Sequence, residues 1–442
     1  QELTHKAVFF KMPITSSGYK NTSFLVWTTT PWTLPANVAL AINPELTHGL
    51  YQKDDEKLIL LQVLAPKILG DEYKLEKEIK GSDLVGLCYK GPFDGLPRVQ
   101  KASQDNLNKY TKPLHIVIEA KDLVTADEGT GIVHIAPGAG AEDFQLSKEN
   151  NLAVIDVIDE GADYLNDLDE FSGKNAKENP EIILDFLKEK DGGKYLFKIE
   201  DYTHRYPTCW RCKTELVWRV VDEWYIAMDK LRQPMIEAAE KIKWLPSFGL
   251  DRELDWLNNM HDWLISKKRY WGLALPIYEC SCGNFEVIGS EEELKEKSVE
   301  GWDEFQGHTP HKPWIDKVKI KCSKCNQKIS RIPDVGNPWL DAGIVPFSTL
   351  KYFEDKNYWQ NWFPTAFICE SFPGQFKNWF YSLIAMSVVL ENQNPFQTVL
   401  GYALVRDKKG EEMHKSKGNA IWFDDAAEKM GVDVMRWMFV TA

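Results

Sequence analysis

The chain has 442 residues, of which 43% are hydrophobic and 12% aromatic, with 17 Trp. At roughly 150 residues per domain this length allows about three domains, and the composition is that of a globular protein with large cores. The net charge of −13 excludes a protein that coats nucleic acid non-specifically, because such binding requires Lys and Arg to neutralise phosphates.

The sequence has no apolar run of about 18 residues, so no membrane span is expected. It has no signal-peptide pattern and begins at Gln1 rather than Met, which indicates a fragment of a longer chain. Six of its eight cysteines fall in three close pairs, an arrangement typical of metal ligands in a reducing compartment. We therefore expect a cytoplasmic protein.

The first 200 or so residues alternate short β-branched and aromatic runs with Gly, Pro and Asp turns, which predicts a compact β-rich domain, barrel-like or sandwich-like. The strands are expected at residues 7–14, 22–30, 58–63, 115–120 and 131–135. A helix is expected after Pro180, because Pro is favoured in the first turn and apolar residues follow it at helical spacing.

From Asp201 onward the pattern changes. Residues 228–244 carry apolar side chains at helical spacing. Residues 366–369 and 399–404 read as buried strands on either side of a helix at 379–391, which is a βαβ unit and implies a parallel sheet. A last helix is expected from Ala426, interrupted near Gly431.

Two sequence blocks in the β-rich part carry polar side chains that could bind a substrate or take part in catalysis. Residues 27–37 read Trp-Thr-Thr-Thr-Pro-Trp-Thr-Leu-Pro-Ala-Asn, a hydroxyl-rich run after a strand. Residues 129–143 supply a second strand with His134, a Gly-rich turn and then Asp143, nine positions after the histidine. Taken singly, threonines on a strand are usually β formers, and a Gly-rich turn before acids is usually a helix start.

Together, in this order, the two blocks resemble the editing pocket of isoleucyl-tRNA synthetases, a class I aminoacyl-tRNA synthetase family. By this resemblance Asp143 would bind the ammonium group of a mischarged amino acid, and His134 would limit the pocket size or orient the ester. The groups that would bind the terminal adenosine and the water are Thr28, Thr29, Thr30, Thr33 and Asn37. The related valyl and leucyl enzymes carry Arg-Pro-Glu or Arg-Pro-Asp where this chain has Thr30-Pro31-Trp32, which favours the isoleucyl type.

A third block, residues 411–419, reads Glu-Glu-Met-His-Lys-Ser-Lys-Gly-Asn and resembles the Lys-Met-Ser-Lys-Ser loop of the class I enzymes. In that family the loop stabilises charge on the phosphates of ATP. By resemblance Lys415 would meet those phosphates and Met413 would pack the loop down.

The segment 370–380 occupies the place of the family's Glu-Gly-x-Asp-Gln-x-x-Gly-Trp-Phe element, which contacts the aminoacyl-adenylate. Its matching residues are Glu370, Gln375 and Trp379, but one residue is inserted and the family's Asp is absent. The His-x-Gly-His element of the class I active site does not occur. This chain alone is therefore not expected to charge tRNA at a normal rate.

Cysteines between the two halves predict a structural zinc site. Cys280 and Cys282 are followed about 40 residues later by Cys322 and Cys325, and four thiolates placed in this way suit tetrahedral Zn²⁺. Cys209 and Cys212 form a second half-site without a partner pair. Free buried cysteines are the alternative interpretation.

The resemblance implies an α/β multidomain chain, with a β-barrel-like editing domain inserted into a Rossmann-type parallel-sheet catalytic domain, plus a zinc ribbon. The expected parts are an editing domain at 1–200, a return to the catalytic core at 201–275, a zinc-ribbon insertion at 276–332 and the second half of the catalytic domain at 333–442.

The implied function is an isoleucine–tRNA ligase with hydrolytic editing of valyl-tRNA for isoleucine, and editing is the activity expected of this chain by itself. The implied partners are the isoleucine tRNA, isoleucine and ATP with Mg²⁺, for a monomeric protein without a membrane. A valyl-type synthetase and a non-catalytic, tRNA-binding zinc module are the alternatives.

Overall fold

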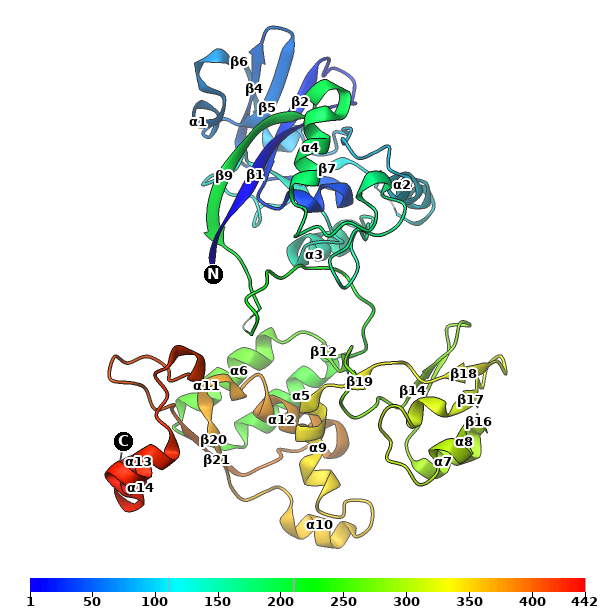
Figure 1. Cartoon of the computed structure of the whole chain (residues 1–442), viewed down its shortest axis with the longest axis vertical. Coiled ribbons are helices and arrows are strands. Elements are labelled where there is room, and N and C mark those ends of the chain that lie inside the picture. The colour runs from blue at the N-terminus through cyan, green and yellow to red at the C-terminus, as the bar shows by residue number, and fades with distance from the viewer. Residues whose placement is uncertain (111, 210, 442) are drawn as a thin grey trace. The chain divides into compact units, whose positions relative to one another are not determined.

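The structure, a computed structural model, describes residues 1–110, 112–209 and 211–441, and the chain divides into two units at Val221/Asp222 (Figure 1). Each unit has its own hydrophobic core. Position 200, where the sequence places the end of the editing domain, lies inside a strand of the first unit. None of the helices in the described part of the chain is long and apolar enough to cross a membrane.

The first unit is built on one mixed sheet of nine strands. Its strands are β1 (Glu2–Pro13), β2 (Thr22–Thr28), β3 (Ala39–Ile42), β4 (Thr47–Lys53), β5 (Glu56–Leu61), β6 (Lys74–Lys80), β7 (Ile116–Glu119), β8 (Ile132–Ile135) and β9 (Leu196–Arg205). Its α-helices are α1 (Ala65–Leu69), α2 (Pro97–Lys109), α3 (Ala141–Asn150) and α4 (Glu181–Glu189), and its 3₁₀ helices are η1 (Pro31–Ala36), η2 (Gly70–Glu72), η3 (Gly81–Asp83), η4 (Asp169–Phe171) and η5 (Lys190–Gly193). The sequence-based expectation of a β-rich domain is confirmed.

Strand β1 is long because it pairs antiparallel with β2 along one edge and with β9 along the other (Figure 1). Alternate residues of a strand point to opposite faces. Accordingly Val8 and Phe10 enter the main core, whereas Phe9 joins a second cluster with Leu25. The sheet thus buries both faces, and the polar groups discussed below emerge where its strands end.

Strand β2 changes partners along its length, and this change creates room for a site. Its first residues pair parallel with β5, and at Trp27 it pairs with Val133 of β8. Strand β3 pairs with β8 on the far side, with Leu40 opposite His134. Consequently the end of β2 and the histidine of β8 lie side by side, about 100 residues apart in sequence.

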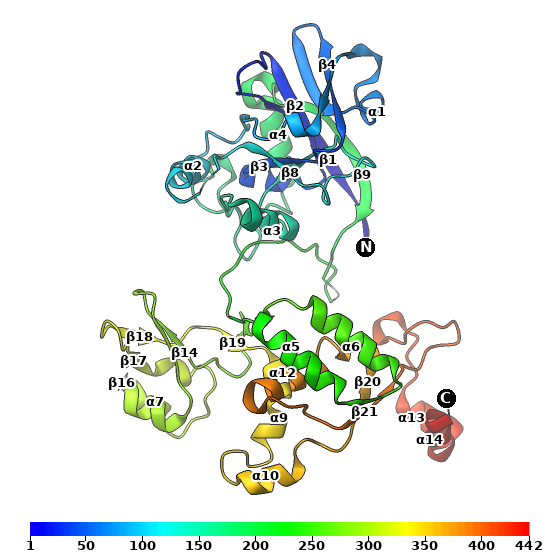
Figure 2. The same ribbon diagram turned by 180° about the vertical axis from the view of Figure 1, so that it is seen from behind.

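The second unit contains a small parallel sheet, in the order β11 (Lys243–Leu245), β21 (Thr398–Tyr402), β20 (Ile368–Ser371). Helix α12 (Trp379–Glu391) connects β20 to β21 and is buried along most of its length, so the predicted βαβ unit is confirmed. Helices α5 (Asp229–Glu240) and α6 (Phe248–Asn259) pack beside each other (Figure 2). The predicted helix at 228–244 therefore ends earlier, and Trp244 lies in β11.

The remaining elements of the second unit are short. The strands are β10 (Tyr225–Ile226), β12 (Trp263–Leu264), β13 (Ser266–Lys267), β14 (Ile277–Glu279), β15 (Phe285–Val287), β16 (Ser298–Glu300), β17 (Lys319–Lys321), β18 (Lys328–Ser330) and β19 (Val335–Gly336). The helices are α7 (Glu291–Lys297), α8 (Trp302–Phe305), the 3₁₀ helix η6 (Ile315–Lys317), α9 (Pro338–Ser348), α10 (Lys356–Trp362), α11 (Phe372–Gln375), the 3₁₀ helix η7 (Lys415–Lys417), α13 (Phe423–Met430) and α14 (Val432–Thr441). The break predicted near Gly431 separates the last two.

Candidate active site

The threonine run turns sharply where β2 ends. Pro31 begins η1, a position that suits its fixed φ and its missing N–H. The Thr28 hydroxyl accepts a hydrogen bond from the N–H of Thr30 at 3.2 Å, and the Thr33 hydroxyl donates to the Thr30 carbonyl at 2.9 Å. These local bonds fix the hydroxyl groups in one cluster instead of leaving them along a strand.

His134 is buried beside this cluster. Its Nε2 lies 3.0 Å from the Thr33 hydroxyl, and its Nδ1 lies 2.8 Å from the amide nitrogen of Asn37. Burial lowers the pKa of His134 to about 3, because an imidazolium would lose its hydration there. The imidazole is therefore neutral near pH 7, and both of its nitrogens are engaged within the protein.

Asp143 lies in the first turn of α3, which begins after the Gly-rich turn. The N–H of Ala136 donates a hydrogen bond to its Oδ2 at 2.7 Å. Burial raises the pKa of Asp143 to about 6, with a smaller contribution from the charge of Glu142. The side chain is thus a half-buried carboxylate that ionises just below neutral pH.

A single cavity of about 350 Å³ joins these groups. The predicted residues that line it are Thr28, Thr29, Thr30, Thr33, His134 and Asp143. Asn37 does not line it: this residue is 4% exposed and lies behind His134, with its amide bonded to that ring. The structure therefore places Asn37 in a position that supports the ring, and its contact with the adenosine or the water stays a prediction.

The segment 123–131 forms a second wall of the cavity that sequence reasoning did not identify. Thr125, Glu128 and Thr130 line the cavity from this segment, and Glu128 accepts a hydrogen bond of 2.5 Å from the Tyr202 hydroxyl. Gly129 lies against Trp27, whose ring a Cβ would approach to 2.9 Å. The signal available in the sequence was the pair of glycines that brackets Thr130, which was interpreted only as the start of the strand that carries His134.

The cavity combines groups that suit hydrolysis of an aminoacyl ester. A carboxylate can hold an ammonium group, and hydroxyls can bind a ribose and a water molecule. With both nitrogens of His134 engaged, its ring offers the cavity a carbon surface rather than a general base. Such an ester is already activated, so positioning a water is the main requirement.

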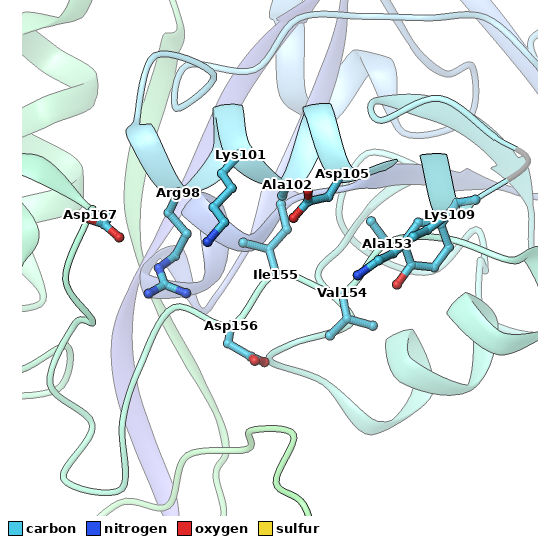
Figure 3. Close-up of a pocket in the computed structure, with 11 residues that line it drawn as sticks. Arg98, Lys101, Ala102, Asp105, Lys109, Ala153, Val154, Ile155, Asp156 and Asp167 are labelled. Carbon is cyan, nitrogen blue, oxygen red and sulfur yellow. The ribbon is translucent and has the colours of Figure 1, made fainter. Parts of the chain in front are cut away.

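A second hollow, of about 220 Å³, lies between α2 and the segment 153–156 (Figure 3). Three cations and three carboxylates line it, namely Arg98, Lys101, Lys109, Asp105, Asp156 and Asp167. Because there are three side chains of each charge sign, together they give the hollow no net charge. None of the predicted site residues lines it, and we place the candidate site at the threonine cavity.

The second unit contains a cluster of four thiols. Cys280 follows β14 and Cys322 follows β17, each at the start of a tight turn that also carries Cys282 or Cys325. The sulfur atoms lie 3.4 Å apart for Cys280 and Cys325 and 3.7 Å apart for Cys282 and Cys322. The cluster could hold a metal ion, and within residues 1–110, 112–209 and 211–441 it is the only group of three or more potential ligands.

The cysteines of the other half-site, Cys209 and Cys212, belong to the first unit. The Cys212 sulfur lies 3.2 Å from the Thr214 hydroxyl. Trp210, which lies between the two cysteines in sequence, is outside the described residues. The structure thus groups one of the two predicted cysteine sets into a four-ligand site.

The five adenylate candidates lie in two segments of the second unit. Glu370, in β20, accepts a hydrogen bond from Tyr402 at 3.2 Å, and Gln375 accepts one from the N–H of Trp379 at 3.4 Å. Lys415, in η7, is exposed and stacks over Trp422, with Nζ 4.6 Å from the ring centroid. Met413, just before it, is half-buried.

An apolar cavity of about 490 Å³ lies next to the ends of β20 and β21. Phe372 and Gly401 line it, but none of the five adenylate candidates does. A Cβ on Gly401 would lie 2.0 Å from the Phe372 ring, so glycine is required there. The residues that replace the family's Gly-x-Asp thus form an apolar surface.

Comparisons place the chain among known proteins. Residues 7–442 match the family described as tRNA synthetases class I (I, L, M and V). The chain is 35% identical over 438 residues to an isoleucine–tRNA ligase of Methanothermobacter marburgensis, covering 99% of this chain and 40% of that protein. It is 39% identical over 444 residues to that of Clostridium novyi, covering 100% of this chain and 41% of that protein.

A crystal structure titled as a ternary LeuRS-tRNA-LeuAMS complex from Agrobacterium radiobacter K84 matches 98% of this chain and 44% of that chain, at 17% identity and a TM-score of 0.31. The chain spans about 40% of the length of the curated relatives that it matches.

Proposed function

The chain belongs to the class I tRNA synthetases, and from this premise we propose that it is the editing and C-terminal catalytic part of an isoleucine–tRNA ligase. Its proposed activity is hydrolysis of valyl-tRNA for isoleucine. Water attacks the ester carbonyl, the bond to the ribose oxygen breaks, and that oxygen takes up a proton. The products are valine and free tRNA.

One observation carries this proposal. The threonine hydroxyls, His134 and Asp143 come from four separate elements, β2, η1, β8 and α3, and line a single cavity. In the proposed complex the Asp143 carboxylate accepts hydrogen bonds from the substrate ammonium group. The threonine hydroxyls hold the ribose and the attacking water, and the His134 ring closes the end that receives the side chain.

A need for such a site follows from the chemistry of the two amino acids. One methylene in a hydrophobic pocket contributes only about 1–3 kcal/mol of discrimination, a value known from isoleucine against valine on isoleucyl enzymes themselves. A synthetic site alone therefore charges valine at an appreciable rate. A second, smaller pocket that accepts valine and excludes isoleucine corrects the error.

A deacylation assay tests the proposal. The chain is incubated separately with valyl and isoleucyl esters of the isoleucine tRNA, and release of each amino acid is measured. We expect the valyl ester to be hydrolysed at least about tenfold faster, because the larger side chain meets the His134 wall. Faster hydrolysis of threonyl-tRNA for valine would identify a valyl-type enzyme instead. No hydrolysis of any ester would favour the non-catalytic zinc module.

The four-thiol cluster fits structural zinc. Zinc–sulfur bonds of about 2.3 Å in a tetrahedron place sulfur atoms about 3.8 Å apart, and the separations of 3.4 and 3.7 Å are close to this value. The four proposed ligands are Cys280, Cys282, Cys322 and Cys325. Bound zinc would cross-link the two turns around a small core that includes Ile320 and Phe305.

Metal analysis checks the zinc assignment. We expect about one zinc per chain, and we expect Cys282→Ser to lose it and to make the segment 276–332 more sensitive to protease. Cys88→Ser is the matched control, because Cys88 lies in the first unit and is not part of the four-thiol cluster. A content of two zinc ions per chain would mean that Cys209 and Cys212 also hold a metal. A content of zero would contradict the zinc assignment.

For the synthetic reaction, ATP with Mg²⁺, isoleucine and the isoleucine tRNA are the proposed substrates of the longer protein. Lys415 is proposed to meet the ATP phosphates, and Met413 is proposed to pack the loop that carries Lys415. Gln375, Trp379 and Glu370 are proposed to contact the adenylate. We propose that the protein acts as a monomer in the cytoplasm.

A further inference from the structure

A buried hydrogen-bond chain leads from the core of the first unit to the candidate site. Tyr89 is 3% exposed, and its hydroxyl donates to Oδ1 of Asn37 at 2.7 Å. The amide nitrogen of Asn37 lies 2.8 Å from Nδ1 of His134, whose Nε2 lies 3.0 Å from the Thr33 hydroxyl. Tyr89 does not line the cavity, so any effect that it has there must pass through this chain.

The orientation of the Asn37 amide is fixed by its neighbours. Its nitrogen lies 3.0 Å from the carbonyl oxygen of Ala39, which can only accept a hydrogen bond. The nitrogen must therefore face Ala39, and the amide oxygen must face Tyr89, whose hydroxyl can donate to it. The backbone of Asn37 is held as well, because His115 donates from Nε2 to the Asn37 carbonyl at 3.2 Å and stacks on Tyr89.

This orientation determines the tautomer of His134. Because Asn37 donates to Nδ1, that nitrogen carries a lone pair, and the ring hydrogen must be on Nε2. Nε2 then donates to the Thr33 hydroxyl, which passes its own hydrogen to the Thr30 carbonyl. Every donor and acceptor in the chain has one consistent assignment, and it begins at the Tyr89 hydroxyl.

We propose that Tyr89 is a positioning residue of the editing site, which through Asn37 holds His134 in the Nε2–H form and fixes the ring that limits the pocket. The part of this proposal that concerns editing rests on the proposed function. The part that concerns the tautomer does not. Removal of the Tyr89 hydroxyl leaves the Asn37 oxygen without its donor, so the amide is held only through its nitrogen and the imidazole is held less firmly.

The test is Tyr89→Phe, which keeps the buried ring and removes only the hydroxyl. In chain labelled with nitrogen-15 histidine, long-range nitrogen–proton correlations distinguish Nε2–H, Nδ1–H and imidazolium forms, and the His134→Gln variant assigns the signal. We expect His134 in the wild-type chain to be neutral and Nε2-protonated, and Tyr89→Phe to shift or broaden that pattern. The ratio of valyl to isoleucyl deacylation should fall by about 3- to 10-fold, the effect of one lost hydrogen bond.

Tyr164→Phe is the matched control. Tyr164 is equally buried, and its hydroxyl donates to the main-chain oxygen of Trp32 at 3.0 Å, without a link to His134. It should leave the His134 spectrum unchanged. An unchanged spectrum in Tyr89→Phe, or an Nδ1–H form in the wild-type chain, overturns the proposal. If the wild-type chain hydrolyses neither ester, the editing function fails, but the spectrum still decides the role of Tyr89.

Discussion

Asp143→Ala is expected to reduce hydrolysis of valyl-tRNA for isoleucine by about 100- to 1000-fold. The loss corresponds to about 3–4 kcal/mol, which is within the range for removing one partner of a buried charge pair. The half-buried carboxylate is placed by the first turn of α3 and by the Ala136 N–H. Without it, the substrate ammonium group would enter the cavity unpaired. The measurement is the single-turnover deacylation rate.

Two variants separate this role from a general effect of the acidic turn. Glu142→Ala removes the exposed neighbouring carboxylate and should keep the rate within about twofold, as is usual for exposed surface positions. Asp143→Asn keeps the shape of the side chain and should lose nearly as much activity as Asp143→Ala. A wild-type rate in Asp143→Ala would show that another group holds the ammonium, and the site assignment would then be wrong.

The pH dependence provides an independent control for the same residue. Because burial raises the pKa of Asp143 to about 6, the charged form predominates only above that pH. The wild-type deacylation rate should therefore fall as the pH drops through 6, and the rate of Asp143→Asn should not show this fall. The same shift means that the protonated carboxyl favours folding, and this contribution is lost as the pH rises through 6. Asp143→Asn should thus be at least as stable as the wild type at pH 7.5.

Local sequence patterns predicted those elements whose conformation is determined by residues that are close together in the sequence. Helix α12 was predicted at 379–391 and has the same bounds in the structure, because a continuous apolar segment between two short strands has few alternatives. The cysteine cluster was also predictable, because each turn is defined by the spacing of its own two cysteines. What the sequence could not show is that the fold brings the two turns into contact.

Contacts between distant segments were not predictable in this way. Asn37 adjoins the threonines in sequence, and the resemblance of this block to an editing pocket predicted that it contacts the substrate. The turn of η1 instead places it behind His134, where it bonds a residue 97 positions away. Tyr89 had no signal in the sequence, and for the wall at 123–131 the only signal was the pair of glycines around Thr130. Their roles arise from partners brought together by the order of strands in the sheet.

Gly138→Ala is expected to destabilise the first unit more than any surface substitution. A Cβ at Gly138 would lie 2.1 Å from the carbonyl oxygen of Ile155 and 2.8 Å from its carbonyl carbon. Both atoms belong to the backbone of a buried residue, so one of the two segments must move. We expect a loss of about 2–4 kcal/mol in the free energy of unfolding, which is roughly 5–15 °C in melting temperature for a unit of this size.

The same displacement should reach the site, because Gly138 lies between Ala136, whose N–H binds Asp143, and the helix that carries Asp143. Deacylation should therefore fall even at temperatures where Gly138→Ala remains folded. Gly95→Ala is the control, since a Cβ there meets no atom within 4 Å, and it should melt at or slightly above the wild-type temperature. If both variants had the melting temperature of the wild type, the close approach of Gly138 to Ile155 would not exist in solution. The backbone support inferred for Asp143 would then have to come from elsewhere.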